Sequence, residues 1–313
     1  MLDPVLINDI TEMLTKHLKP NQIDAIGRML FKRYNSHEKL GIDDHITIPR
    51  RRAAEALIDD CLDGKKEEDL IKCLIELDGS DLLGKPVTFD NIESFMKDMV
   101  SSGYLYDYKK RKIKILKTDP NELPNWGALR EGKNYEVTVV SIDIVGNSVL
   151  VKKYGMKKIE RMYAKFWNLL RRVLSVYDGR IWSWSGDGGL VAFAFKDHQT
   201  RAVLFALELQ SVLSVFNVDP SLPIDEAISL RIGLDTGNMK FSQNTGQIVS
   251  ETINYAAHLE KSFTSPGKVS ISKELYNRIS ENLQSIFDCE GEFEGRTAFC
   301  TNTQVSMLAQ ARN

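Results

Sequence analysis

From residue 135 onward the chain alternates between β-branched stretches and long amphipathic stretches, and this order limits the fold more than any other feature. EVTVVSIDI, from Glu136, is a near-continuous apolar run, which predicts a strand buried on both faces. The next segment predicts a long helix, because apolar residues recur at helical spacing. These residues are Ile159, Met162, Phe166, Leu169, Val173 and Leu174. IWSWS and GLVAFAF then predict two strands joined by a tight turn over 186–189.

The remainder of this region completes the order. A second helix is predicted by Val203, Leu204, Leu207 and Leu213. The strand LRIGLDTG, ending in a turn, a helix over 252–261 and the short strand KVSIS follow. Strand, helix, strand, strand, helix, strand is the ferredoxin-like βαββαβ arrangement of α+β proteins. We therefore expect an antiparallel sheet with helices packed on one face.

Residues 1–117 predict a separate, mainly helical domain. Apolar residues recur at helical spacing near the N-terminus, and further helices are expected around 52–62, 67–77 and 90–102. Residues 104–117 alternate on both sides of a basic turn, which predicts a β-hairpin. Helices followed by a hairpin with a basic tip are typical of a winged-helix unit. DNA contact through that hairpin is one interpretation, but the slight acidity of the domain favours a protein-interaction or sensor module.

Residues 118–133 contain two prolines and two glycines without periodicity and predict a linker, so the second domain is expected over 134–313. The whole chain has 41 basic and 43 acidic residues, which argues against a nucleic-acid coat. No apolar run reaches the roughly 18 residues that a membrane span needs, and the N-terminus lacks a basic leader. We therefore expect a cytoplasmic protein without a membrane partner.

Two aspartates stand at the ends of predicted strands. Asp143 ends the first strand, and Asp187 lies at the tip of the turn between the next two. We expect the first strand to lie between its sequence neighbours, so that both tips converge. Two carboxylates that share a pair of Mg²⁺ ions are a common way to bind a nucleoside triphosphate. The plain alternative is that Asp143 caps a helix and Asp187 is an ordinary turn residue.

Four motifs in order resemble the catalytic domain of class III nucleotidyl cyclases: SIDIVGNS, WSGDGGLVAF, LRIGLDTG and ETINYAAHLE…PGKVSIS. The resemblance covers about Tyr135 to Cys300 and implies conversion of a nucleoside triphosphate into a 3′,5′-cyclic nucleotide and pyrophosphate. Residues 1–117 share none of it.

The resemblance also implies roles for individual residues. Asp143 and Asp187, with the backbone carbonyl of Ile144, correspond to the ligands of two Mg²⁺ or Mn²⁺ ions per active site. Arg231 corresponds to a phosphate-binding arginine. Asn254 corresponds to the asparagine that orients the ribose from the partner subunit, which implies a homodimer with shared sites. The backbone amides expected at the triphosphate are those of Val145, Gly146, Asn147 and Ser148.

Two positions depart from the family pattern near the reacting phosphate. His258 stands where the family usually has the arginine that stabilises charge on the α-phosphate, four residues after Asn254 and on the same helix face. An imidazole is shorter and only partly charged near neutral pH. Arg296 lies near the family's phosphate-binding lysine. A catalytically degenerate nucleotide-binding regulator is therefore an alternative to an active enzyme.

The positions that select the base also depart. The family places charged residues where this chain has Ser183 and Gln247, while Trp182 and Trp184 are expected to alternate away from Ser183 and pack the sheet. A hydroxyl and an amide can pair with either edge of a pyrimidine. The chain thus resembles the Pycsar pyrimidine cyclases of anti-phage defence, which make cyclic UMP or cyclic CMP for a downstream effector. An adenylate cyclase that makes cyclic AMP is the alternative.

Overall fold

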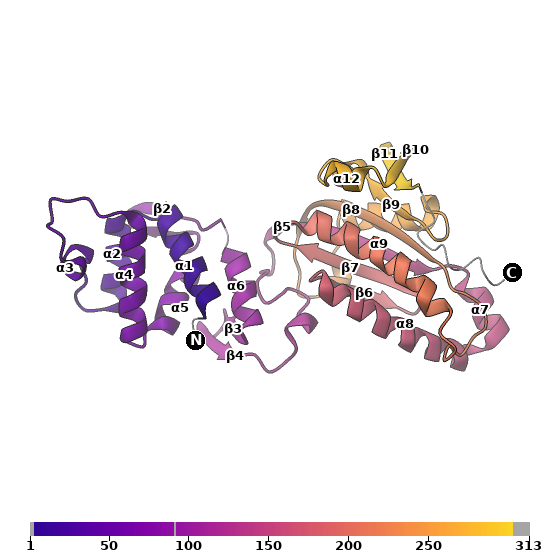
Figure 1. The fold of residues 1–313 in the computed structure, drawn as a ribbon, viewed down its shortest axis with the longest axis horizontal. Helices are drawn as coiled ribbons and strands as arrows, with labels where there is room; N and C mark the ends of the chain where they lie inside the picture. The colour runs from indigo at the N-terminus through magenta and orange to yellow at the C-terminus, as the bar shows by residue number, and fades with distance from the viewer. Residues whose placement is uncertain (1–2, 91, 303–313) are drawn as a thin grey trace. The chain divides into compact units, whose positions relative to one another are not determined.

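The computed structural model describes residues 3–90 and 92–302, and their contacts divide the chain into two compact units (Figure 1). The first unit contains the residues up to 120 together with 126–128. The second contains 121–125 and the residues from 129 onward. Residues of the segment 118–133 therefore belong to both units.

The first unit is a helical bundle with two small hairpins. Its helices are α1 (Pro4–His17), α2 (Pro20–Leu30), α3 (Ser36–Leu40), α4 (Arg50–Asp63), α5 (Glu67–Leu77) and α6 (Ile92–Ser101). The hairpins are β1 (Ser80–Leu82) with β2 (Lys85–Val87), and β3 (Tyr104–Asp107) with β4 (Lys112–Ile115). The hairpin expected over 104–117 is thus present. Its basic residues are partly neutralised, because Arg111 pairs with Glu76 and Lys114 pairs with Asp107.

The second unit is built on a seven-stranded sheet with strand order β10-β11-β9-β8-β5-β7-β6. Its strands are β5 (Asn134–Ile144), β6 (Arg180–Ser185), β7 (Gly188–Ala194), β8 (Leu230–Lys240), β9 (Val269–Ser272), β10 (Phe287–Phe293) and β11 (Arg296–Thr301). Its helices are α7 (Asn147–Tyr154), α8 (Met156–Val176), α9 (His198–Asn217), α10 (Glu251–His258), α11 (Lys273–Tyr276) and α12 (Glu281–Gln284). The α+β fold class is confirmed, and β8-β5-β7-β6 form the expected ferredoxin-like core.

Three details of the topology differ from expectation. β5 lies between β7 and β8, not beside its sequence neighbour β6. β8 continues to Lys240 instead of ending in a turn at Gly237, because β5 is long enough to pair with it as far as Asn134. β9 adds to β8 in parallel, so the sheet is mixed.

Helices cover both faces of the sheet, not one. On one face α8 and α9 lie across the strands (Figure 1), and their apolar residues share a core with Ile142 and Ile232. On the other face α10 packs against β5 and β8. This approach requires glycine in β8, because a Cβ on Gly233 would come within 2.5 Å of the Ala256 carbonyl, and one on Gly237 within 2.5 Å of Thr252 Oγ1. The glycines of LRIGLDTG therefore make room for a helix.

Both outer strands of the sheet are irregular. The pairing register shifts between Ile181 and Ser183 in β6, and between Cys289 and Gly291 in β10. In β6 the shift separates the two tryptophans, which strict alternation would place together. Trp182 packs against Phe241, whereas Trp184 packs against Phe166 and Trp167 of α8. The expectation that both turn away from Ser183 in the same way was wrong, because the bulge resets the alternation.

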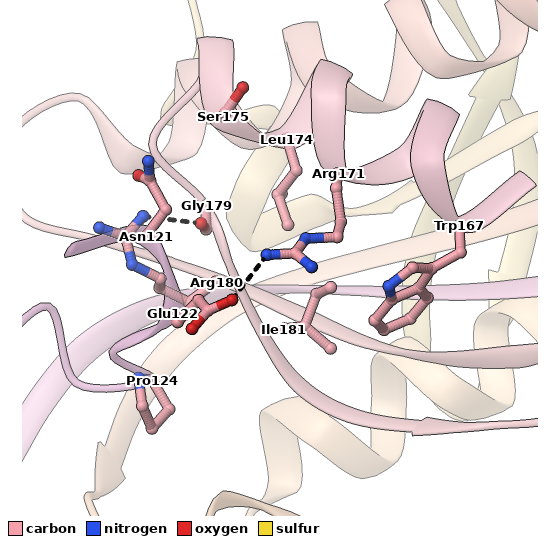
Figure 2. Close-up of a pocket in the computed structure, with 10 residues that line it drawn as sticks. All are labelled: Asn121, Glu122, Pro124, Trp167, Arg171, Leu174, Ser175, Gly179, Arg180 and Ile181. Carbon is pink, nitrogen blue, oxygen red and sulfur yellow. Dashed lines mark hydrogen bonds and ion pairs between the residues drawn. The ribbon is translucent and has the colours of Figure 1, made fainter. Parts of the chain in front are cut away.

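Residues 121–125 are fastened to this irregular edge. The Arg180 guanidinium Nε donates to the Leu123 carbonyl at 3.1 Å, and the Trp182 indole donates to the Pro124 carbonyl at 2.9 Å. Figure 2 shows Glu122 meeting Arg171 of α8, at 3.1 Å, across the mouth of a pocket floored by β6. Part of the expected linker, residues 121–125, is therefore held by side chains of the second unit.

Candidate active site

The strand pairing brings Asp143 and Asp187 together. Asp143 pairs across the sheet with Gly188, and the Ile144 amide donates to the Asp187 carbonyl at 3.1 Å. A Cβ on Gly188 would lie 2.6 Å from the Ile142 carbonyl, so only glycine lets the turn approach the end of β5. The two carboxylates therefore stand at neighbouring strand ends, as their positions in the sequence predict.

The negative charges of these two aspartates affect the pKa of Tyr163 in α8. Burial raises the pKa of the Tyr163 phenol, and the negative charges of Asp187 and Asp143 raise it further. Its hydroxyl donates to Oδ1 of Asn147, at the start of α7. The phenol thus contacts the first turn of α7, which carries the expected phosphate-binding amides.

Arg231 is the cross-strand partner of Asp143 on β8. Its Nη2 donates to Asp143 Oδ2 at 2.7 Å, its Nη1 donates to the Lys261 carbonyl at 3.3 Å, and its Nε lies 3.1 Å from Glu260 Oε1. One guanidinium is therefore shared by two carboxylates. The structure brings together Asp143, Asp187 and Arg231, and it adds Glu260.

Sequence reasoning missed Glu260. The chain leaves α10 as a π-helix over Leu259–Phe263, which carries Glu260 against β8 at Gly233. In the sequence Glu260 stands between Leu259 and Lys261, and nothing in this pattern marks it as a site residue.

The charge of the site is unbalanced toward the negative. The pKa of Glu260 is raised to about 7, mainly because the side chain is buried. The negative charge of Asp143 also raises this pKa, whereas the positive charge of Arg231 lowers it. Asp143 and Asp187 carry carboxylate oxygens, which are the ligands that hard divalent cations such as Mg²⁺ or Mn²⁺ take. Among the described residues, no group of three or more acidic, histidine or cysteine side chains is arranged to hold a metal ion, so the fit rests on the chemistry of these two carboxylates.

One of the backbone amides that follow Asp143 already donates a hydrogen bond within the fold. The Val145 amide donates to the Ser229 carbonyl at 2.9 Å, so this one of the four expected amides is already engaged. Gly146 takes a left-handed conformation, with φ of 70°, and starts α7. The amides of Asn147 and Ser148 fall in the first turn, where helix N–H groups have no partner within the helix.

Asn254 and His258 lie on α10, away from the carboxylate pair. Both are exposed, and His258 Nδ1 lies 2.8 Å from Glu294 Oε1. Within residues 3–90 and 92–302, no hydrogen bond or ion pair joins either residue to Asp143, Asp187 or Arg231. Their side chains are presented to the outside of this copy of the chain.

Arg296 is engaged with α10 and the sheet. Its guanidinium lies 4.6 Å from the centre of the Tyr255 ring, pairs with Glu251, and lies 3.6 Å from the buried carboxylate of Asp235. Burial raises the pKa of Asp235 to about 6. These contacts give Arg296 a role in holding α10 in place.

The turn that carries Gln247 lies beside β6. Thr245, in the 3₁₀ turn Thr245–Gln247, donates to the Trp182 carbonyl at 2.6 Å. A Cβ on Gly246 would lie 3.9 Å from Ser183 Oγ. The backbone before Gln247 therefore approaches Ser183, although 64 positions separate the two residues.

Among the described residues, none of the helices combines the length and the apolar composition needed to cross a membrane.

The chain was compared with curated proteins, solved structures and protein families. A putative adenylate cyclase 3 from Rhizobium meliloti is 28% identical over 141 residues, which are 45% of this chain but only 23% of that protein. One similar solved structure is the catalytic core of a rhodopsin-guanylyl cyclase with converted specificity, in complex with ATPαS. It is 24% identical to this chain, with a TM-score of 0.47, and the match covers 55% of this chain and 99% of that one. The adenylyl cyclase CyaB from P. aeruginosa is 19% identical with a TM-score of 0.47, covering 56% and 97%.

Residues 130–306, more than half of the chain, match the family described as the adenylate and guanylate cyclase catalytic domain. The chain therefore belongs to the family of adenylate and guanylate cyclase catalytic domains.

Proposed function

We propose that this protein converts a nucleoside triphosphate into a 3′,5′-cyclic nucleotide and pyrophosphate. The observation that carries the proposal is the meeting of Asp143, Asp187 and Arg231 at one end of the sheet. Carboxylates for cations and a guanidinium for phosphate are the groups that phosphoryl transfer needs.

The residues have separate tasks in this proposal. Asp143, Asp187 and the Ile144 carbonyl hold two Mg²⁺ or Mn²⁺ ions, which lower the pKa of the ribose 3′-hydroxyl and neutralise the phosphates when bound. Arg231 and the first amides of α7 hold the triphosphate. The 3′-oxygen loses its proton to solvent and forms a bond to the α-phosphorus. The bond between that phosphorus and the bridging oxygen breaks, and pyrophosphate leaves.

The proposed enzyme is a homodimer with shared sites. Asn254 and His258 are exposed on α10 and make no contact with the carboxylate pair of their own chain, among the described residues. This placement supports a role for them in the site of a second copy. There Asn254 orients the ribose, and His258 supplies the partial positive charge that the family's arginine gives.

For the base, we propose a pyrimidine. Neither Ser183 nor Gln247 carries a charge, and the turn before Gln247 approaches Ser183, which supports hydrogen bonding of a hydroxyl and an amide to UTP or CTP. The product would then be cyclic UMP or cyclic CMP, acting on a downstream effector in anti-phage defence. ATP is the second candidate, because the relative from Rhizobium meliloti is named a putative adenylate cyclase.

The base prediction is tested with the purified chain and each of the four nucleoside triphosphates, with Mn²⁺ or Mg²⁺. Mass spectrometry should show a cyclic pyrimidine nucleotide as the main product. A preference for ATP of about tenfold or more in kcat/KM, equivalent to about 1.4 kcal/mol, would contradict it. If UTP or CTP is preferred, the double change Ser183→Lys with Gln247→Asp should lower that preference. Binding of a nucleotide without turnover of any of the four would instead support a degenerate regulator.

Removal of residues 1–117 should change the rate, or its dependence on protein concentration, without changing the product. The reason is that residues 121–125 are held on β6 and α8 by Arg180, Trp182 and Arg171, so a domain attached there can bias how two catalytic units meet. Initial rates and sedimentation across a range of protein concentrations measure both effects. If neither the kinetics nor the dimerisation changes, the remaining role for this domain is targeting or partner binding.

A further inference from the structure

The Arg231 guanidinium is held between two acids that bond it unequally. On the Asp143 side, Nη2 makes an aligned hydrogen bond of 2.7 Å. On the Glu260 side, Nε and Oε1 are 3.1 Å apart, yet neither atom has an aligned hydrogen-bond partner among the described residues, and both are shielded from solvent. Buried polar atoms are almost always satisfied, so this pair calls for a reason.

The surroundings fix Glu260 more firmly than Arg231. Its side chain is only 9% exposed, and the π-helix that carries it is pressed against β8 at Gly233, where a Cβ would lie 2.5 Å from the Glu260 amide. The Arg231 side chain is 26% exposed and reaches its partners on a flexible stem. When the arrangement changes, we therefore expect the guanidinium to move and the Glu260 carboxylate to stay.

We propose that Glu260 is a positioning residue that retains Arg231 in the active site when a cation takes over Asp143. Arg231 pairs with Asp143 at 2.7 Å, so it competes with a cation for that carboxylate. Once a cation neutralises that carboxylate, its positive charge repels the guanidinium, and a rotation onto Glu260 completes the hydrogen bond that is misaligned now. Arg231 then keeps N–H groups directed at the triphosphate. This inference rests on the proposed function of Asp143 and Arg231.

The first measurement tests Arg231 as the counter-ion. Tb³⁺ alone is the probe, because this hard cation takes carboxylate oxygens and its luminescence is excited through nearby aromatic rings such as Tyr163. Removing the competing guanidinium in Arg231→Gln should tighten Tb³⁺ binding by about fivefold to tenfold. Asp143→Asn should remove this binding. Equal affinity in Arg231→Gln and the unmodified chain would overturn the counter-ion role.

The second measurement tests Glu260 itself, with inorganic tripolyphosphate in excess Mn²⁺ followed by calorimetry. Removal of the negative charge that Glu260 carries should by itself strengthen anion binding. If Glu260 positions Arg231, Glu260→Gln should instead weaken tripolyphosphate binding by about tenfold, and the charge-keeping variant Glu260→Asp should recover part of it. The matched control is Glu226→Gln, which removes an equivalent charge from an exposed pair with Lys153 and should bind as the unmodified chain does.

The results separate the two proposals. Tripolyphosphate binding in Glu260→Gln that is unchanged or tighter overturns the positioning role alone, provided that Asp143→Asn has lost Tb³⁺. Retention of Tb³⁺ by both Asp143→Asn and Asp187→Asn overturns the metal site, and with it the proposed function. Thermal melting of each variant identifies any that has not folded, in which case Glu260→Asp carries the test.

Discussion

Replacement of Asp143 or Asp187 by Asn should abolish cyclisation while leaving the fold intact. Each carboxylate stands at a strand end, half-buried, and not in the apolar core between the sheet, α8 and α9. Asparagine keeps the shape and one oxygen but removes the charge that a divalent cation needs. Loss of several kcal/mol of charge stabilisation in the transition state corresponds to a fall in kcat on the order of 10³-fold or more.

The measurement is turnover of the preferred nucleotide with Mn²⁺, alongside circular dichroism and thermal melting. Asp219→Asn is the matched control, because Asp219 is also an acidic residue of the second unit and is paired with Lys165 on the surface. It should keep the rate of the unmodified chain. Near-normal turnover in either Asp143→Asn or Asp187→Asn would disprove the assignment of the two-cation site.

Mixing two inactive variants should restore activity if the site is shared between copies. In a mixed dimer of Asp187→Asn and Asn254→Ala, one site combines the intact Asp187 of one chain with the intact Asn254 of the other. The second site carries both changes. Random exchange makes half of the dimers mixed, with half of their sites intact, so activity should reach roughly a quarter of the original.

The control for this experiment is a mixture of Asp143→Asn with Asp187→Asn. Both changes fall in the carboxylate half of the site, so every site of the mixed dimer remains damaged and no activity should return. Subunit exchange is verified with differently tagged chains. Exchange without recovery in the first mixture would show that one chain forms the whole site.

The long elements of the second unit, such as β5, α8 and β8, could be predicted from their apolar patterns, whereas α7, α11, α12, β10 and β11 were not predicted. The apolar stripe of α8, from Ile159 to Leu174, is buried as a whole. The order of the strands in the sheet was harder to predict, because the spacing of apolar residues along the chain does not reveal that β5 pairs with β7 and β8. The small hairpin β1–β2 was missed because its three-residue strands have too few positions to show alternation.

The residues of the candidate site also fall into those that the sequence could predict and those that it could not. Asp143 and Asp187 could be chosen because one lies at the end of a predicted strand and the other in the turn between the next two, and Arg231 because the resemblance assigns it to phosphate binding; the sheet then brings the three together. Glu260 could not, because its position depends on a π-helix and on the close approach that Gly233 permits. The engagement of Val145 with Ser229 is a contact between segments that are distant in the sequence, and no local pattern indicates it.

The bulges in β6 and β10 have a consequence for how copies of this protein can assemble. A regular outer strand presents a row of free backbone groups, which is a template for adding a strand from another molecule. Here both outer strands lose their regular spacing, and β6 also has residues 121–125 held beside it. Continuous sheets that run from one molecule into the next are therefore disfavoured at both edges. A second copy is therefore expected to meet this one through helices or a face of the sheet more readily than through its edges.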